Sequence, residues 1–377
     1  MTLSVTLLAG AGLLLRSVEA LSRVDPGFDP SRVLAFRLSG NWGETQDRDR
    51  LVRRIDVTLE ELGALPGVES AATSWSLPGV PRQYQIEFEL IEGRSDSEPP
   101  LVAEWRTVSP GYFRTLRIPF VAGEACRPRP DASAAPHVLV NRSFADQYFR
   151  GRSVIGLHLS WEAASRTGRI AGVVHDVRER GIDHDPAPTV YACDSAPNPF
   201  PWFVVRTRGE PLAMANAVRL KLKEVEPLRS VYDIRPLEEW IGGSYAQNRL
   251  RTVLVTIFAA TALFLACLGV YGTLSYVVSL RRREVGLRLA LGGVRSDVVR
   301  ELVGGALQVV GLAGICGLAL SIAFTRVLSG MLYGVSPQDP LTLVTVLGIV
   351  LAVGSLAALI PAARATAVQP MRVLREE

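Results

Sequence analysis

Five side chains that could bind a metal ion lie together in the stretch HDVRERGIDHD. They are His175, Asp176, Asp183, His184 and Asp185. Imidazole and carboxylate groups are zinc ligands, so this cluster is the first candidate for chemistry. Its spacing matches no helical H-x-x-x-H site, and Pro186 and Pro188 follow directly. The pattern therefore favours an exposed, solvated turn over a metal centre.

Other catalytic patterns are weaker still. The segment around Ser153 reads GRSVIG, which differs from the G-x-S-x-G turn of serine hydrolases. The GAG at Gly10 lies in an apolar run and lacks the third glycine of a dinucleotide-binding loop, so it indicates helix packing. The sequence contains no G-x-x-x-x-G-K-S/T phosphate loop. We therefore expect no catalytic, cofactor-binding or metal-binding residues and no ATP site of the Walker type.

Composition indicates a membrane protein with a folded aqueous part. Of 377 residues, 48% are hydrophobic, yet 21% are charged, a fraction close to that of soluble domains. The net charge of +4 is small for this length, and no Lys/Arg block is interleaved with aromatic residues, so we expect no nucleic-acid partner. Cys267 and Cys316 lie in apolar runs. Cys126 and Cys193 could form a disulfide, although nothing in the sequence shows that they are close in space.

Long uncharged runs predict the membrane helices. The runs from Thr252 to Leu280, Leu302 to Thr325 and Leu341 to Ala363 each exceed the ~20 residues that cross a bilayer. Residues 1–15 are apolar too, but shorter than a comfortable span, and they lack the features of a cleaved signal peptide. We interpret them as the end of a further membrane helix.

The distribution of arginine predicts the orientation. The connection at 281–301 and the tail at 364–377 are rich in arginine, so both should lie in the cytoplasm by the positive-inside rule. Four helices with both termini in the cytoplasm place residues 25–248 outside it, as the large extracytoplasmic domain of a multi-pass protein of the cell (inner) membrane.

The outer segment has internal order. A strand, an amphipathic helix and a strand are predicted within residues 30–80, and the same order recurs within residues 200–240. Two such units at the ends of the segment suggest a split, ferredoxin-like layer of helices on a sheet. Residues 81–200 contain short alternating strands and Pro/Gly turns, which predict an inserted, strand-rich subdomain.

The arginine-rich connection is an amphipathic elbow. Leu287, Leu291 and Val298 recur at helical spacing, and Glu284 precedes Arg288 by four residues, the favourable order for a helical ion pair. Gly292-Gly293 should turn the chain, so that a new helix runs from about Arg295 into the membrane. On these grounds alone the elbow is a loop that lies on the lipid surface with its arginines near anionic headgroups.

The elbow and the tail each carry a long motif. An R-x-x-E-x-G-x-R-x-A-x-G pattern follows the second helix and is carried here by Arg281, Glu284, Gly286, Arg288, Ala290 and Gly292. This pattern and the tail IPAARATAVQPMRVLREE resemble the coupling region and the ending of the FtsX-like and MacB-type ABC transporter permeases. Outer stretches such as VSPGYFRTLRIPFVAGE resemble the MacB-like permeases of acidobacteria, in which the unit occurs twice. The chain resembles the second half, so a half-length permease and a fragment that begins inside a helix both stay open.

The resemblance implies a fold and a function. The fold is membrane α-helical, with four transmembrane helices and a large α+β extracytoplasmic domain of the MacB periplasmic-core type. The function is mechanotransmission, in which a separate ABC ATPase docks on the elbow, a second permease half (a second copy or a companion) completes the transporter, and motion of the outer domain drives export of an amphiphilic substrate. The docking residues implied are Arg281, Arg283, Glu284, Gly286, Arg288, Ala290 and Gly292.

Two other classes of function stay open. An FtsX-like signalling permease would relay ATPase motion to an outer enzyme and move no solute, whereas a membrane-anchored enzyme would need metal or nucleophile chemistry within residues 25–248. The segments expected under any of these are a short first helix at 1–17, the outer domain at 25–248, a second helix at 250–280, the elbow at 281–301, a third helix at 302–326, a fourth at 341–363 and a cytoplasmic tail at 364–377.

Overall fold

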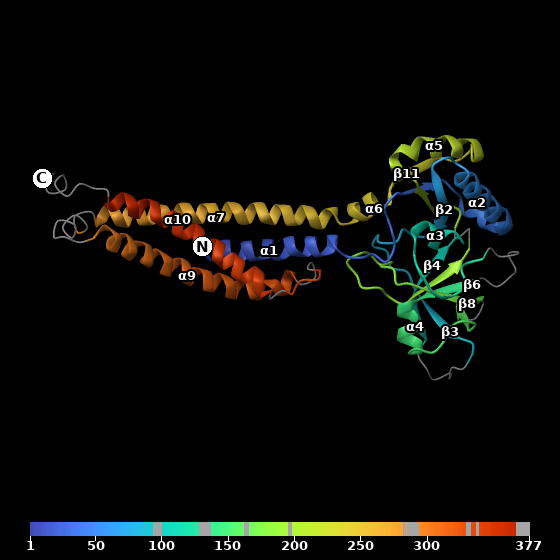
Figure 1. Ribbon diagram of the computed structural model, residues 1–377, viewed down its shortest axis with the longest axis horizontal. Coiled ribbons are helices and arrows are strands. Elements are labelled where there is room, and N and C mark those ends of the chain that lie inside the picture. The colour runs from blue at the N-terminus through green and yellow to red at the C-terminus, as the bar shows by residue number, and fades with distance from the viewer. Residues whose placement is uncertain are drawn as a thin grey trace. The chain divides into compact units, whose positions relative to one another are not determined.

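The chain divides into two units. The computed structural model describes residues 1–92, 100–127, 137–161, 166–194, 198–281, 284, 294–328, 333–336 and 339–366. One unit combines Met1–Arg23 with Ala246–Glu377, and the other is Val24–Tyr245 (Figure 1). The first is helical and the second mixes helices and strands. The predicted fold class, membrane helices joined to a large α+β domain, is confirmed.

Within the described ranges, four helices are long and apolar enough to cross a membrane. They are α1 Thr2–Ser22, α7 Ala246–Leu280, α9 Arg295–Leu328 and α10 Pro340–Thr366. Each extends beyond the uncharged run that predicted it: α1 continues past residue 17, and α9 begins upstream of residue 302. The runs count only uncharged residues, whereas arginine and glutamate are good helix formers that continue a helix past its apolar part.

Small residues let these helices approach closely. A Cβ atom on Gly317 of α9 would lie 2.6 Å from the Cβ of Val5 on α1, and one on Gly354 of α10 would lie 3.1 Å from a methyl group of Val310 on α9. Thr6 of α1 also donates a hydrogen bond to the carbonyl oxygen of Gly317, over 3.2 Å. Such contacts replace the hydrophobic driving force that helices lack in lipid.

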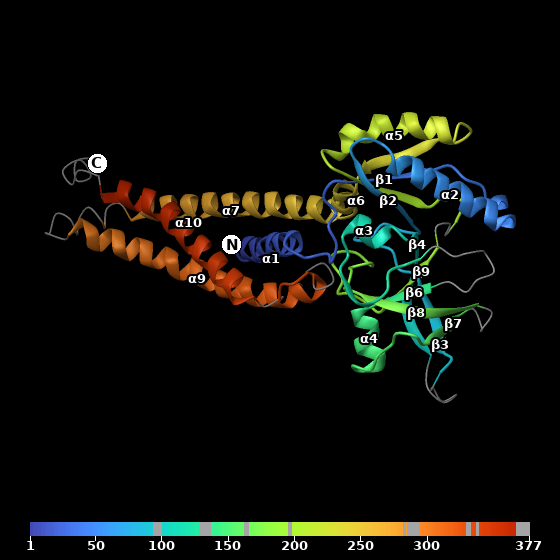
Figure 2. The same cartoon turned by 45° about the vertical axis from the view of Figure 1, so that its right-hand side comes forward.

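Two β-α-β segments form one half of the α+β unit. They comprise β1 Val33–Leu38, α2 Arg48–Gly63, β2 Val68–Ser74, β10 Trp202–Thr207, α5 Pro211–Val225 and β11 Val231–Pro236. The strands pair antiparallel in the order β11-β1-β10-β2, which is the ferredoxin-like order. Residues of α2 and α5 share one apolar cluster with Leu34, Phe36 and Leu38 of β1, so both helices cover the same face of the sheet (Figure 2).

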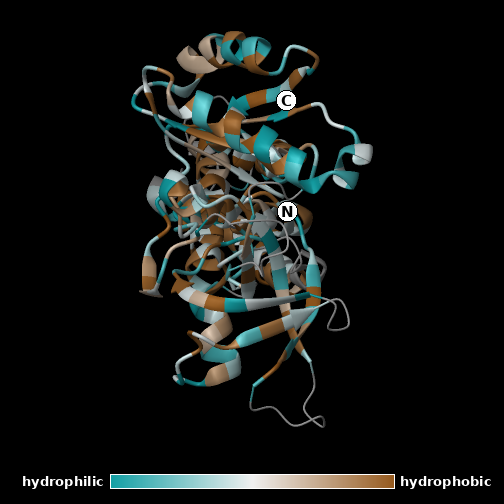
Figure 3. Ribbon diagram, turned by 90° about the vertical axis from the view of Figure 1, so that its right-hand side faces the viewer, coloured by the Kyte–Doolittle hydropathy of each residue, from teal (hydrophilic) through white to brown (hydrophobic). Residues whose placement is uncertain are grey.

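The sequence dictates this packing through its periodicity. Leu51, Ile55 and Leu62 of α2 recur at helical spacing and are buried, while Asp47 caps the helix by accepting a hydrogen bond from the backbone N–H of Arg50, over 3.0 Å. Along the strands, hydrophobic and hydrophilic residues alternate in part, as Figure 3 shows.

The inserted residues form a β-barrel. The strands are β3 Gln85–Leu90, β4 Leu101–Val108, β5 Phe120–Gly123, β6 His137–Asn141, β7 His158–Trp161, β8 Arg166–Val174 and β9 Thr189–Cys193. Pairing runs β4-β3-β7-β8-β6-β9 and returns from β9 to β4, so these strands close on themselves. Phe88, Trp105 and Trp161 contact one another in the apolar cluster of this barrel. Closure leaves these strands without the unpaired edges of an open sheet.

Short helices complete the α+β unit. They are η1 Trp42–Gln46, α3 Tyr112–Leu116, α4 Arg142–Phe149 and α6 Leu237–Ser244. Helix α6 is separated from the membrane helix α7 by Tyr245 alone.

A disulfide joins Cys126 to Cys193, the pair that the sequence left open. Their Cα atoms are 5.5 Å apart across a sequence separation of 67 residues. Cys193 ends β9, and Cys126 lies just after β5, which pairs only with β8 among the described strands. The disulfide therefore ties an exposed strand to the barrel. Cys267 and Cys316 are free.

Candidate coupling site

The ends of α7 and α9 bring two arginines of the predicted elbow, Arg281 and Arg300, to one cleft. Arg281 follows the last residue of α7, is exposed, and donates its backbone N–H to the carbonyl oxygen of Val277, over 3.0 Å. Arg281, Arg300 and Glu301 line the same cleft of about 620 Å³ between α7 and α9, whose remaining lining is mostly apolar. This end of the helix unit is thus charged.

Two of the predicted docking residues lie among those that the structure describes. Arg281 and Glu284 are both exposed, which suits residues that contact a partner. The other predicted docking residues lie outside the described residues: Arg283, Gly286, Arg288, Ala290 and Gly292. Helix α9 begins at Arg295, with Asp297 in its first turn, where a carboxylate interacts favourably with the helix dipole.

Residues 256–370 match the FtsX-like permease C-terminal family. This region includes most of α7, the elbow, α9 and α10. These residues form an FtsX-like permease domain. The assignment to the FtsX/MacB type made from the sequence is confirmed, and the permease domain supplies three of the four membrane helices described above.

Curated proteins similar to this chain carry the name macrolide export ATP-binding/permease protein MacB. The protein from Hyphomonas neptunium is 31% identical over 126 residues, which cover 33% of this chain and 19% of the relative. The one from Campylobacter jejuni is 34% identical over 77 residues, covering 20% of this chain and 12% of the relative. The match thus spans at most about a fifth of the length of these relatives.

Solved structures similar to the chain include two outer domains. The periplasmic region of MacB from Actinobacillus actinomycetemcomitans has a TM-score of 0.38 and 12% identity, covering 56% of this chain and 92% of that one. The extracellular domain of the noncanonic ABC-type transporter YknZ from Gram-positive bacteria has a TM-score of 0.32 and 11% identity, covering 53% and 100%.

The candidate metal cluster has structural roles instead. Asp176 accepts a hydrogen bond from the backbone N–H of Ser143 over 2.8 Å, Asp183 accepts one from the Tyr245 hydroxyl over 2.7 Å, and Asp185 pairs with Arg178 at 3.4 Å. Among the residues that the structure describes, no group of three His, Cys, Asp or Glu side chains could hold a metal ion.

The five candidate side chains are not buried, as a solvated turn requires, but two residues between them are. His175, His184 and Asp185 face solvent, whereas Val177 is fully buried and Glu179 is 2% exposed. The prolines at 186 and 188 indicate only that the segment is irregular, which is compatible with burial when its polar groups have partners.

A fully buried charge cluster was missed by the sequence reasoning. Arg106 and Glu104 of β4 are 0% exposed and lie 3.1 Å apart, and Arg106 also contacts the Glu179 carboxylate at 3.1 Å. The Tyr191 hydroxyl donates to Glu179 over 3.0 Å. Burial raises the pKa of Glu179 above its ordinary value, and the adjacent Arg106 cation offsets only part of that shift. One signal was available: in the strand LVAEWRTV the two charges are two residues apart and so share a face.

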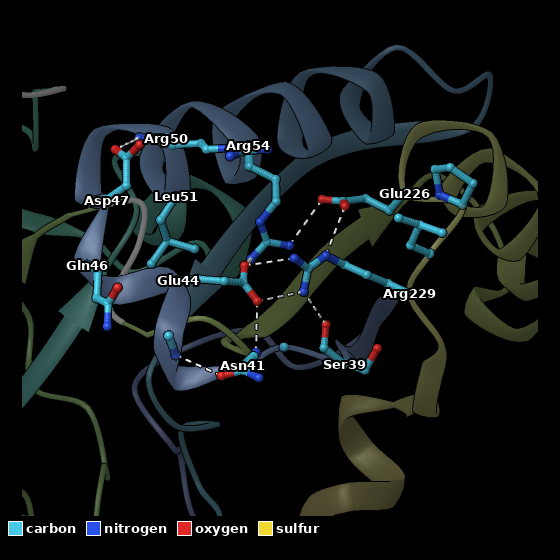
Figure 4. A pocket seen from close by; sticks show the side chains of 14 residues that line it. Ser39, Asn41, Glu44, Gln46, Asp47, Arg50, Leu51, Arg54, Glu226 and Arg229 are labelled. Atoms are coloured by element: carbon cyan, nitrogen blue, oxygen red, sulfur yellow. Dashed lines mark hydrogen bonds and ion pairs between the residues drawn. The ribbon is translucent and has the colours of Figure 1, made fainter.

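A second charged cluster lines a groove of about 950 Å³ (Figure 4). Arg229 lies 2.7 Å from Glu44 and 3.0 Å from Glu226, while Arg54 lies 3.1 Å from Glu226 and 3.4 Å from Glu44. These ion pairs join η1 and α2 to the connection between α5 and β11. Because each of the four charges meets two of opposite sign, the cluster holds the ferredoxin-like half together.

Proposed function

We propose that this chain is the permease subunit of an ABC transporter, in which the membrane helices transmit motion from a separate ATPase to the α+β unit. The observation that carries the proposal is the FtsX-like match over residues 256–370, joined in one chain to the large α+β unit. In this proposal the motion drives export or extrusion of an amphiphilic substrate, and a second copy or a companion half completes the transporter.

Two observations support an extracytoplasmic position for the α+β unit. The Cys126–Cys193 disulfide is the kind of bond that forms and persists outside the reducing cytosol. Arg281 follows the C-terminal end of α7, Arg300 lies near the N-terminal end of α9 and Arg364 lies near the C-terminal end of α10, and a cytoplasmic position for these three ends follows the positive-inside rule. Both termini are then cytoplasmic.

Assignment of ATP hydrolysis to a partner rests on the sequence. It contains no G-x-x-x-x-G-K-S/T motif, and in this proposal a separate ATPase supplies the energy. The elbow at 281–301 is the proposed docking surface. Arg281 and Arg283 would contact acidic groups of the partner or the lipid surface. Glu284 and Arg288 would contact the ATPase directly. The small residues Gly286, Ala290 and Gly292 would allow the two backbones to approach closely.

Substitutions in the elbow test the proposal. We expect Glu284→Ala and Gly286→Trp to reduce the amount of ATPase that co-purifies with the tagged chain by at least about tenfold, because loss of one docked charge or of close backbone contact costs about 2 kcal/mol or more. The measurement is co-purification from detergent with the ABC ATPase encoded beside the chain, at matched expression.

Glu19→Ala is the matched control. Glu19 is an acidic residue at the other end of the helix unit, where it pairs with Arg23. This variant should retain the ATPase fully. Equal ATPase recovery with native, Glu284→Ala and Gly286→Trp chains would rule out docking through the elbow, and no ATPase with the native chain would contradict the proposed function itself.

A further inference from the structure

Residues 176–185, which we call the clasp loop, contact the chain where it leaves α1. The backbone N–H of Arg178 donates to the carbonyl oxygen of Pro26 over 3.0 Å. The next residue, Gly27, has φ +80°, and a Cβ atom there would lie 1.9 Å from the carbonyl oxygen of Asp176. Since only glycine permits such an approach, the α1 connection is seated directly on the backbone of the clasp loop.

The same loop contacts the chain just before α7. The hydroxyl of Tyr245, the last residue before that helix, donates to Oδ1 of Asp183 over 2.7 Å. Tyr245 is 9% exposed. A Cβ atom on Gly181, where φ is +122°, would lie 2.5 Å from the Tyr245 hydroxyl, so the loop leaves room for that side chain and little else.

The centre of the clasp loop is fixed to the barrel. Glu179 contacts Arg106 at 3.1 Å, and the Arg180 guanidinium contacts Glu104 at 2.8 Å, so two successive loop residues pair with strand β4. Breaking a buried pair of this kind is costly because it leaves an uncompensated charge in the interior. The loop and β4 should therefore move as one body.

A third segment closes the arrangement. The backbone N–H of Gly79 donates to the carbonyl oxygen of Arg178 over 3.2 Å. A Cβ atom on Gly79 would lie 3.2 Å from the ring of Phe28, which follows α1, and 3.1 Å from Ile241 of α6, which precedes α7. Gly79 therefore contacts the clasp loop, the segment that follows α1 and the helix that precedes α7.

We infer that the clasp loop is the element that couples the α1 and α7 connections to the barrel, with Tyr245 and Asp183 as the positioning residues on the α7 side. This inference rests on the proposed function. The charged pairs at Glu179 and Arg180 hold the loop on β4, whereas the hydrogen bond from the Tyr245 hydroxyl to Asp183 joins the loop to the residue that precedes α7. A displacement of α7 would reach the barrel through Tyr245 and this loop.

The test compares Tyr245→Phe with Tyr148→Phe in the full chain, bound to its ATPase in lipid nanodiscs. Tyr148 also uses its hydroxyl for hydrogen bonds, donating to the carbonyl oxygen of Val102 over 2.7 Å and accepting from the Val102 N–H over 3.2 Å, outside the clasp loop. The readout is hydrogen exchange of residues 103–108 and 176–185, which excludes the Val102 amide, with and without a non-hydrolysable nucleotide. We expect Tyr245→Phe to reduce the nucleotide-dependent change by roughly fivefold, the factor set by one hydrogen bond of ordinary net strength, and Tyr148→Phe to leave it as in the native chain.

Asp183 variants make the test specific. Asp183→Ala should reduce the response as Tyr245→Phe does, the double variant should be no worse than either, and Asp183→Asn, which keeps an acceptor oxygen, should respond like the native chain. ATPase binding should be unchanged in all of them because the elbow is intact.

The outcomes separate the two proposals. A native response in Tyr245→Phe and Asp183→Ala would overturn the role of the clasp loop and leave the proposed function standing. A native chain that binds its ATPase but shows no nucleotide-dependent exchange in these residues would overturn both the clasp inference and the transmission of motion to the α+β unit.

Discussion

Replacement of Arg106 by alanine is expected to lower the free energy of unfolding of the α+β unit by about 3–5 kcal/mol. The Arg106 side chain is fully buried between the carboxylates of Glu104 and Glu179, and it also donates to the carbonyl oxygen of Arg82 over 2.9 Å. Without it, the carboxylates of Glu104 and Glu179 stay in the interior, where Arg180 still pairs with Glu104. The expected loss reflects the cost of leaving a buried charge without a partner, which is larger than the net contribution of the ion pair to stability.

The loss should depend on pH in a defined direction. Burial already raises the pKa of Glu179 in the folded protein, and removal of Arg106 eliminates the charge that opposes this shift. The folded variant then binds more protons than the unfolded chain, so its stability falls as pH rises through the raised pKa. We expect a smaller loss at about pH 5, where a buried carboxyl can take up a proton, than at about pH 8.

Tryptophan fluorescence in denaturant would measure the effect, because all six tryptophans of the chain lie within Val24–Tyr245. The control is Arg117→Ala, which removes a guanidinium that is 43% exposed and pairs with Asp29 and Glu69. An exposed pair of this kind contributes about 1 kcal/mol or less. Equal losses for Arg106→Ala and Arg117→Ala would show that the buried cluster carries no special penalty.

The membrane helices and the ferredoxin-like half could be predicted because their signals are local. An uncharged run such as Thr252 to Leu280 specifies a membrane helix by itself, and the two strand-helix-strand patterns specify their own elements. Closure of the barrel could not be predicted in the same way, since it depends on pairing between β4 and β9, far apart in the chain. Helix ends were displaced because charged residues continue a helix beyond its apolar run.

The burial of Arg106 and the structural role of residues 175–185 could not be predicted from residue types alone. Arginine and glutamate are almost never fully buried unless paired, so the type of Arg106 alone predicts a surface position. Its burial depends on residues 176–185 folding over β4, and the same fold converts the metal-like HDVRERGIDHD into a structural loop. The elbow pattern from Arg281 to Gly292 stays a prediction, with Arg281 and Glu284 placed and exposed.

Loss of the Cys126–Cys193 disulfide should also have a large effect, about 2–4 kcal/mol of unfolding free energy. The bond closes a loop across a sequence separation of 67 residues, so in the chain-entropy account it removes many conformations from the unfolded state. Because all four residues of β5 are exposed, little apolar burial near Cys126 compensates for its loss. We expect the Cys126→Ser, Cys193→Ser double variant to unfold at lower denaturant concentration by tryptophan fluorescence.

Cys267→Ser with Cys316→Ser is the matched control, since these two cysteines are free and lie in α7 and α9. That variant should keep the native midpoint and should still lose stability when a reductant is added, whereas the Cys126→Ser, Cys193→Ser variant should not respond to reductant. The disulfide also tests the orientation of the α+β unit. The unsubstituted chain is taken from cells, denatured, and treated with a thiol-alkylating reagent before and after reduction. If the α+β unit is extracytoplasmic, two cysteines should be labelled before reduction and four after it, because the disulfide forms only in an oxidising compartment. Labelling of all four cysteines without reduction would place Cys126 and Cys193 in a reducing environment and contradict the proposed orientation.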